Sequence, residues 1–598
     1  MPAPAKVVKL VEKFARNREE YESGSYNETQ ARRDFIDPLL KALGWDVDNS
    51  RGASERYREV VHEDKVRIGG ETKAPDYSCR LGGNRVFFVE AKKPGVDLKT
   101  RPEPAFQLRR YAWSAKLPVS VLTDFDELAI YDTTLRPNLK DAATVGRLRY
   151  WTSSEFVEKW DEIAGILSRD AVESGAFDRF AAERKRKRTQ PVDEDFLEAI
   201  EGWRELLAKD IAKGNPKIGV EDLNFSVQRI LDRIIFLRIC EDRRIEQVGR
   251  LGALANVTGV YGHLKQLFDF ADQRYNSGLF HFRQEKDRHE SPDTVTPKLK
   301  VSDQALKKII GALYDDAPWA FDVIPSDILG SIYERFLGKT IRLTPAHLVK
   351  VEEKPEVRKA GGVYYTPKYV VDYIVQETVG KLLEGKTPKQ AAEVKILDPA
   401  CGSGSFLIGA YQYLLDWHLE QYLKAPEKHK KQLKQVREGE WRLATSERKR
   451  ILINSIFGVD LDPQAVEVTK LSLLLKVLEG ETGESIQLAM ELSHERALPD
   501  LGDNVQCGNS LVGRDLYAQE DLGIGGDNDP LSLHPFEWGE AFEPVFRRGG
   551  FDVVIGNPPY VRIQTLKADQ PALVTYLQNA YESTRRGNFD LYVAFLER

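Results

Sequence analysis

Cysteine is scarce in this chain of 598 residues. The four cysteines are Cys79, Cys240, Cys401 and Cys507, and they form neither a CxxC pair nor a cluster with histidine. Such spacing excludes a disulfide framework and a structural zinc site. We therefore expect four reduced thiols.

Long hydrophobic runs are also missing. No stretch approaches the roughly 18 apolar residues of a membrane span, and the N-terminal sequence MPAPAKVVKLVEKFARNREEY lacks the apolar centre of a signal peptide. We expect no membrane partner and a cytoplasmic location. The formal net charge is only −6, so a surface that binds nucleic acid would have to be local.

Length and residue pattern divide the chain into several domains. A chain of this size predicts about three or four domains of about 100 to 200 residues each. We expect a multidomain α/β protein with a mixed α/β domain over 1–165, a basic linker over 166–190, a helical connector over 191–345 and a parallel α/β domain over 346–598. The run Arg184–Arg188 favours a solvated linker, with contact to a DNA backbone as the alternative.

A glycine-rich turn, DPACGSG over 398–404, follows the predicted strand 394–397 in the last domain. At the carboxyl end of a parallel strand, such a turn lets a ligand approach the backbone, and the following helix N-terminus favours negative groups. Asp460 ends a second predicted strand, where it could accept hydrogen bonds from ribose hydroxyls. The charged stretch from Glu427 to Lys449 between them is expected to be a helical, solvated insertion.

The segment Asn557-Pro558-Pro559-Tyr560 follows another predicted strand, 551–556. The lone pair of an exocyclic adenine amine is delocalised into the ring, and hydrogen bonds from N6 to the Asn557 oxygen and the Pro558 carbonyl would localise it. Tyr560 offers a face for an extruded base, a contact worth about 1 to 3 kcal/mol. The amide of Asn509, after a third apolar segment, could read an adenine edge.

These segments, in this order, resemble the gamma-class DNA adenine-N6 methyltransferases, and so does the upstream element Gly361–Pro367. The resemblance implies a Rossmann-like domain that uses S-adenosylmethionine. Asn509 departs from the more usual Asp of that family. The resemblance assigns cofactor binding to Thr366, Asp398, Ala400, Gly402, Gly404, Asp460 and Asn509, and catalysis to Asn557, Pro558, Pro559 and Tyr560.

Near the other end of the chain, Asp76, Glu90 and Lys92 are spaced as in a metal-dependent nuclease. A Gly82-Gly83 turn would place Asp76 opposite residues 89–91 in a hairpin, and alternation puts Glu90 and Lys92 on one face. Two ionised carboxylates favour a hard cation such as Mg²⁺, which would support phosphodiester hydrolysis with Lys92 orienting water or stabilising charge. An exposed hairpin with salt bridges is the alternative interpretation.

This PD-(D/E)xK arrangement and its neighbours resemble the nuclease domains of type I and type IIG restriction enzymes. Glu28 lies in ETQARRDFIDPLLKALGW, which resembles their opening helix, where such an acid assists the metal site. Gln107 and Tyr111 resemble their QxxxY element, and their spacing places both on one helical face. Together, the two ends of the chain resemble a type IIG-like fused restriction-modification enzyme that cleaves double-stranded DNA and methylates adenine.

A Walker A pattern is also present, from Gly380 to Thr387. The residues before it are helix-like and Pro388 follows, so we predict a helix C-terminus and no ATP requirement. The alternatives are an ATP-dependent type I or ISP component, a methyltransferase with an inactive nuclease fold, and a regulatory subunit that binds S-adenosylmethionine. Because the chain stops in an apparent helix at Arg598, we expect further sheet strands and a target-recognition domain beyond it.

Overall fold

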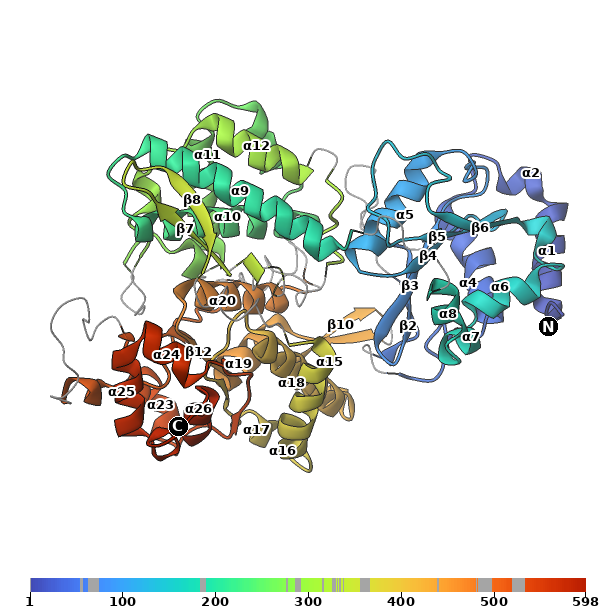
Figure 1. The fold of residues 1–598 in the computed structure, drawn as a ribbon. Helices are drawn as coiled ribbons and strands as arrows, with labels where there is room; N and C mark the ends of the chain where they lie inside the picture. Colours follow the sequence, from blue (N-terminus) through green and yellow to red (C-terminus); the bar gives the residue numbers. More distant parts are fainter. Residues whose placement is uncertain are drawn as a thin grey trace. The chain divides into compact units, whose positions relative to one another are not determined.

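The computed structural model describes residues 2–53, 57–62, 75–182, 190–275, 278–284, 292–314, 317–324, 330, 332, 335–336, 338–354, 366–437, 440–479, 481, 497–518 and 533–598. The chain forms two compact units (Figure 1). The first contains Met1–Phe196 and Tyr314–Pro325, and the second contains Leu197–Leu313 and Ser326–Arg598. In the described part of the chain no helix is long and apolar enough to cross a membrane. All four cysteines are free, as predicted.

The first unit is built on a six-stranded sheet whose strands lie in chain order. Only β3 and β4 are parallel, and α5 (Pro102–Ser114) connects them; the other neighbours are antiparallel. The strands are β1 (Val60–His62), β2 (Tyr77–Leu81), β3 (Asn84–Ala91), β4 (Val119–Thr123), β5 (Glu127–Asp132) and β6 (Arg147–Thr152).

The predicted hairpin is formed by β2 and β3. Gly82 and Gly83 have φ values of 58° and 83°, and two consecutive residues with positive φ make the tight turn whose twist matches that of the flanking strands. The register pairs Tyr77 with Val89. Asp76 is therefore set at the level of residue 90, as the sequence predicts.

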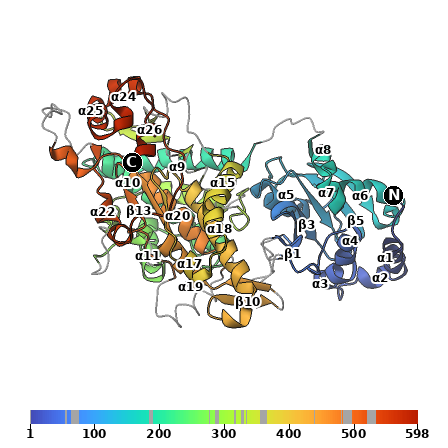
Figure 2. The same ribbon diagram turned by 90° about the horizontal axis from the view of Figure 1, so that it is seen from below.

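Helices cover both faces of this sheet (Figure 2). One core contains side chains from α1 (Ala5–Arg16), α4 (Asp37–Ala42), α6 (Trp160–Leu167), α7 (Arg169–Glu173) and α8 (Ala176–Ala182). The other contains side chains from α5 and from residues 317–324. Because Val172 and Phe177 are buried in the first core, the unit extends past the boundary expected at residue 165. The basic run Arg184–Arg188 lies outside the described residues.

The second unit begins with a mostly helical layer, as the pattern predicts. Its helices are α9 (Val192–Gly214), which starts before the unit boundary, α10 (Val220–Asp242), α11 (Val260–Tyr275) and α12 (Asp303–Tyr314). A hairpin of β7 (Lys339–Leu343) and β8 (Val349–Glu353) follows. Most of α10 is buried on every side, including the arginines Arg229, Arg233 and Arg238, so this helix is a core element of the unit.

A four-stranded parallel sheet forms the rest of the second unit, in the order β13 (Val505–Cys507), β12 (Ile456–Asp460), β9 (Ile396–Asp398), β14 (Val553–Val554). Helices α18 (Ser405–Leu423), α19 (Thr445–Ser455) and α20 (Pro463–Val477) connect its strands, and α24 (Ile563–Asp569), α25 (Pro571–Ala580) and α26 (Tyr592–Glu597) form a small terminal core.

The insertion after α18 differs from the prediction. Residues expected to be helical form an antiparallel hairpin, β10 (Leu433–Arg437) and β11 (Glu440–Leu443), and only the last part of the stretch belongs to α19. Leu433 and Leu443 are opposite each other and buried. The helical prediction was wrong because cross-strand pairing of these two side chains outweighs the local preference of a charged sequence.

Candidate functional site

In the second unit, the predicted catalytic loop meets the glycine-rich turn at one edge of the sheet. Ile555 continues β14 alongside β9, because its amide donates to the Leu397 carbonyl at 2.9 Å. A Cβ atom on Gly556 would lie 2.5 Å from Asp398 Oδ1. Only glycine allows this approach, and Asn557 is thereby delivered beside the residue that begins the turn.

Thr366 and Asn557, separated by 191 positions, are brought into direct contact. Asn557 Nδ2 donates to Thr366 Oγ1 at 3.2 Å. Thr366 precedes α15 (Lys368–Val375), and α15 packs against α18, the helix that follows the glycine-rich turn. The three segments chosen from the sequence therefore converge. The rest of the upstream element, Gly361–Tyr365, lies outside the described residues.

The glycine-rich turn has the backbone conformation that its residues suggest. Gly402 and Gly404 have φ values of 53° and 84°, and Gly404 is the N-cap residue of α18. A Cβ atom on Gly404 would lie 2.8 Å from Thr469 Cγ2. The Ala400 amide donates to Asp398 Oδ1 at 3.0 Å, which holds the acid inside the turn.

Asp460 ties the second strand to the same turn. Its carboxylate accepts the amides of Gly402 and Asp462, each at 2.8 Å. Burial raises the pKa of Asp460 to about 6, although these two amides and Lys354 oppose the rise. The carboxylate is thus placed at the carboxyl ends of β9 and β12, where a ligand hydroxyl could donate to it.

The third loop closes on the turn through a residue that the sequence did not indicate. Ser510 Oγ donates to the Pro399 carbonyl at 2.5 Å. Asn509 Oδ1 accepts the Leu511 amide at 3.1 Å. The assignment of Asn509 to cofactor binding stays a prediction, in which the remaining donors and acceptor site of its side-chain amide would contact the cofactor. Ser510 was missed because one serine after a strand carries no distinctive signal.

Tyr560 is available for stacking, with 63% of its surface exposed. Its ring centroid lies 5.5 Å from that of Tyr592 on α26. The preceding prolines, Pro558 and Pro559, leave the segment outside any helix or strand. An exposed aromatic ring is therefore present three residues after Asn557, and its stacking on a base stays a prediction.

A separate cavity of about 790 Å³ lies in the second unit, lined by residues of α10, α20 and the end of β13. Arg229, Glu467 and Cys507 are among its lining residues, and none of the predicted cofactor residues is. The sequence did not indicate this cavity, because it forms where elements distant along the chain meet.

The Walker A pattern is not a phosphate-binding loop in this structure. Its first residue, Gly380, ends the π-helical segment Gln376–Gly380, which continues α15, and Lys381–Leu383 form α16. Gly385 has a φ of 72°, and Thr387 caps α17 (Pro388–Ala391). In the described residues 366–380, helix and no strand precedes the pattern, so the predicted helix C-terminus is confirmed.

In the first unit, the predicted acids lie at the hairpin. Asp76 and Glu90 are both fully buried. Asp76 Oδ2 accepts the Ala91 amide at 2.8 Å, and Glu90 Oε1 lies 2.5 Å from Lys92 Nζ. These contacts place the Asp76 carboxylate beside the strand that carries Glu90 and Lys92.

The face of β3 that carries the predicted residues Glu90 and Lys92 is the one that α5 covers. Phe88 packs with Leu108 of α5, and strand alternation puts Glu90 and Lys92 on the same face as Phe88. Gln107 precedes Leu108, and Tyr111 is buried one turn further along. A direct contact between Gln107 and the acids stays a prediction.

Arg32 contacts Asp76 from the opposite side and was not singled out from the sequence. Arg32 Nη1 lies 3.2 Å from Asp76 Oδ1, and its Cζ lies 4.7 Å from the centroid of the Tyr77 ring. Burial opposes its charge, yet Asp76, Tyr77 and Asp37 together raise the pKa of Arg32. The signal was available, since Arg32 stands four residues after Glu28 and shares its helical face.

These residues fit a hard divalent cation in part. Two buried carboxylates on adjacent strands supply the oxygen ligands that Mg²⁺ prefers. In the described residues, however, no three His, Cys, Asp or Glu side chains gather in a metal-binding group. Glu28 therefore does not complete such a group with Asp76 and Glu90 in the described residues, and its role stays a prediction.

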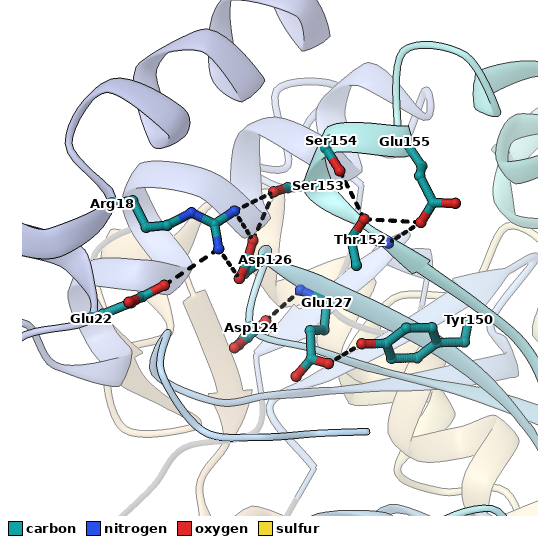
Figure 3. Close-up of polar contacts among 10 residues, drawn as sticks. All are labelled: Arg18, Glu22, Asp124, Asp126, Glu127, Tyr150, Thr152, Ser153, Ser154 and Glu155. Atoms are coloured by element: carbon teal, nitrogen blue, oxygen red, sulfur yellow. Dashed lines mark hydrogen bonds and ion pairs between the residues drawn. The ribbon is translucent and has the colours of Figure 1, made fainter. Parts of the chain in front are cut away.

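A second group of acids in this unit is structural (Figure 3). Asp126 is held by Arg18 at 2.7 Å and by Ser153 at 2.8 Å, and Tyr150 donates to Glu127. Glu127 also accepts the Leu98 amide at 2.7 Å, and the Glu127 amide donates to Asp124. This cluster anchors the segment between β3 and α5, so it positions the elements that carry Lys92 and Gln107.

Three family models match the chain. Residues 57–139 match the N terminus of the type I restriction enzyme R protein, residues 325–497 match N-6 DNA methylase, and residues 454–598 match the Eco57I restriction-modification methylase. These matches cover the two regions whose geometry is described above. The chain thus joins a restriction-enzyme N-terminal region to a DNA methylase region, the layout of a fused restriction-modification protein.

Its relatives support the same class. The chain is homologous to the type II restriction enzyme and methyltransferase RM.Eco57I of Escherichia coli, with 36% identity over 595 residues, covering 99% of this chain and 56% of that protein. The adenine-specific methyltransferase PglX of Streptomyces coelicolor is 26% identical over 207 residues, which cover 35% of this chain and 15% of that protein. The methylase subunit of type I restriction enzyme MjaIX of Methanocaldococcus jannaschii is 31% identical over 157 residues, which cover 26% of this chain and 18% of that protein. The resemblance to fused restriction-modification enzymes is confirmed, and the chain spans about half the length of RM.Eco57I.

Two solved structures are also similar. The first is a DrdV–DNA complex, which is 16% identical, with a match that covers 99% of this chain and 48% of that chain at a TM-score of 0.35. The second is the type IIG restriction endonuclease BpuSI, which is 13% identical, with a match that covers 95% of this chain and 49% of that chain at a TM-score of 0.32.

Proposed function

We propose that the whole protein is a bifunctional restriction-modification enzyme of the bacterial cytoplasm. It cleaves double-stranded DNA with Mg²⁺ and protects host DNA by methylating adenine at N6 with S-adenosylmethionine. The observation that carries the methyltransferase half is the contact between Asn557 and Thr366 beside the turn that contains Gly402 and Gly404. The strand order further supports a Rossmann-like domain, with β9 next to both β12 and β14.

The methylation site is arranged to raise the nucleophilicity of an exocyclic amine. S-adenosylmethionine supplies the activated methyl group when bound. Because Asn557 Nδ2 donates to Thr366, its Oδ1 is left to accept from adenine N6, together with the Pro558 carbonyl. Tyr560 stacks on the extruded base. Held in this way, N6 would be directed at the methyl group that the cofactor supplies, and the N6 proton released on methylation would leave to solvent.

The nuclease half rests on Asp76 and Glu90 at the same level of two adjacent strands. Mg²⁺ would supply polarisation of the scissile phosphate and activation of a water molecule. Lys92, whose ammonium contacts Glu90, is placed to orient that water or to stabilise charge on the phosphate. Gln107 on α5 is proposed to support this site.

Two reciprocal variants of the full-length protein test the proposal. Glu90→Ala should lower DNA cleavage at least about 100-fold and leave methylation intact, whereas Asn557→Ala should do the opposite. Cleavage is measured on plasmid DNA, and methylation by mass spectrometry of N6-methyladenine after incubation with labelled cofactor. Unchanged cleavage by Glu90→Ala and by Lys92→Ala would contradict the assignment of these residues, and absence of cleavage by the wild-type protein would instead support an inactive nuclease fold. Absence of N6-methyladenine with the wild-type protein would support a regulatory subunit.

A further inference from the structure

Arg32 is held against the proposed nuclease site by several independent contacts. Its Nη1 lies 3.2 Å from Asp76 Oδ1, and its Nη2 donates to the Asp76 carbonyl at 3.3 Å and contacts His62 Nδ1 at 3.1 Å. The guanidinium also covers the buried ring of Tyr77, whose hydroxyl donates to Asp37 at 2.7 Å. The side chain is only 17% exposed, so its charge is directed at Asp76.

Each of the two buried acids of the proposed site has a basic partner. Asp76 and Glu90 are fully buried acids, and each contacts one cation, Arg32 and Lys92 respectively. Buried charges are tolerated only when they are paired. A divalent cation bound to the same two carboxylates would add two positive charges beside the guanidinium of Arg32 and the ammonium of Lys92.

The two carboxylate oxygens of Asp76 have different hydrogen-bond partners. Oδ2 is fixed by the Ala91 amide at 2.8 Å, a contact that does not depend on Arg32. Oδ1 is the atom that Arg32 contacts. An ion that used Oδ1 as a ligand would therefore compete with the guanidinium, while the backbone of β3 would keep the carboxylate in place.

We propose that Arg32 is a resident counter-cation of the nuclease site, a positioning residue that competes with Mg²⁺ for Asp76. It stabilises the paired acids while the metal is absent and lowers the affinity of the site for the metal. This inference rests on the proposed nuclease function. Arg33 provides a matched control, because it is the next residue of the same helical segment, contacts Asp34 at 3.3 Å and is 75% exposed.

The test compares full-length wild-type protein with Arg32→Gln, Arg32→Lys and Arg33→Gln. Binding of MgCl₂ and CaCl₂ is measured by isothermal titration calorimetry, and the melting temperature is measured with EDTA and with each ion. Arg32→Gln should bind the ions about tenfold more tightly. It should melt at a lower temperature than wild type in EDTA and gain more on addition of the ion. Arg32→Lys should bind the ions with an affinity between those of wild type and Arg32→Gln, because it retains the charge but loses the forked contacts of the guanidinium. Arg33→Gln should not differ from wild type.

Unchanged or weaker ion binding by Arg32→Gln would overturn the inference, provided that Asp76→Ala abolishes binding. In that case, loss of ion binding by Asp76→Ala would still support the proposed nuclease site, and only the role of Arg32 would be wrong. If Asp76→Ala binds the ions as wild type does, the metal site itself is wrongly assigned and the proposed nuclease function fails with it. The far-ultraviolet circular dichroism spectrum of every variant serves as the control for folding of the first unit, and methylation of adenine serves as the control for the second unit.

Discussion

Asp460 shows how a single residue can be unfavourable for the fold and useful for binding. Burial raises its pKa from the ordinary 3.8 to about 6. Between these two values the folded state binds more protons than the unfolded state. The contribution of Asp460 to stability is therefore present below about pH 4 and is lost as the pH rises to about 6. At neutral pH the buried charge is retained, at a cost to the fold, where the proposed ribose hydroxyls would donate to it.

The affinity for S-adenosylmethionine should therefore depend on pH. Only the ionised carboxylate accepts both the loop amides and ligand hydroxyls, so the affinity should fall about tenfold per pH unit below pH 6 and level off above pH 7. Calorimetric titration of the cofactor from pH 5 to pH 8 measures this dependence. Asp460→Asn should bind weakly at every pH, with a flat profile. A flat profile for the wild-type protein would contradict the proposed role.

At the scale of elements, two glycine-containing turns in the methylase region look alike in sequence and differ in structure. Gly404 and Gly385 both have positive φ, 84° and 72°. A Cβ on Gly404 would meet Thr469 at 2.8 Å, whereas nothing lies within 4 Å of the corresponding position on Gly385. The first turn is packed between α18 and α20, and the second only ends a helix. Packing therefore separates the predicted cofactor loop from the Walker A pattern.

Alanine substitutions should separate these two turns. Gly385→Ala should cost only backbone strain, about 1–2 kcal/mol, and should leave S-adenosylmethionine binding unchanged. Gly404→Ala should add the cost of overpacking, about 1–3 kcal/mol, and should reduce cofactor binding by more than about tenfold. Urea denaturation and cofactor titration of both variants provide the comparison. Equal effects on binding would mean that the packing of the Gly404 turn is not what shapes the cofactor site.

The two hairpins show which elements could be predicted. The β2–β3 hairpin was foreseen because Gly82 and Gly83 set its turn locally and apolar residues follow at once. The β10–β11 hairpin was mistaken for a helix because its stabilising contact joins Leu433 to Leu443, ten positions apart in a charged stretch. Local turn chemistry is readable from sequence, whereas a pairing between distant positions is not.

At the scale of the whole molecule, the chain returns to its first unit after leaving it. Residues 317–324 pack on α5: the Ala320 amide donates to Ser114 Oγ at 2.9 Å, and Arg110 donates to the Trp319 carbonyl at 2.6 Å. Phe321 is fully buried, 5.4 Å from the ring of Phe196. The nuclease-like unit is therefore completed by residues more than a hundred positions beyond its main segment.

Phe321→Ala should accordingly destabilise the first unit by about 3–5 kcal/mol. Hydrogen exchange monitored by mass spectrometry should show faster exchange in α5 and in β3, the elements next to this segment. Leu139→Ala, at a site that is 50% exposed in the same unit, should have almost no effect. Unchanged exchange in α5 of Phe321→Ala would show that the returning segment does not support that unit.

The sequence by itself determined the residues on which the proposed chemistry rests: Asp76, Glu90 and Lys92, the glycine turn at 402–404 and the loop beginning at Asn557. Those residues follow from local rules of turns, strand alternation and strand ends, which act over a few positions. Only the tertiary structure decided that Thr366 contacts Asn557, that Arg32 pairs with Asp76, and that residues 317–324 complete the first unit. Each of these contacts joins positions more than forty residues apart, and such pairings depend on how whole elements pack.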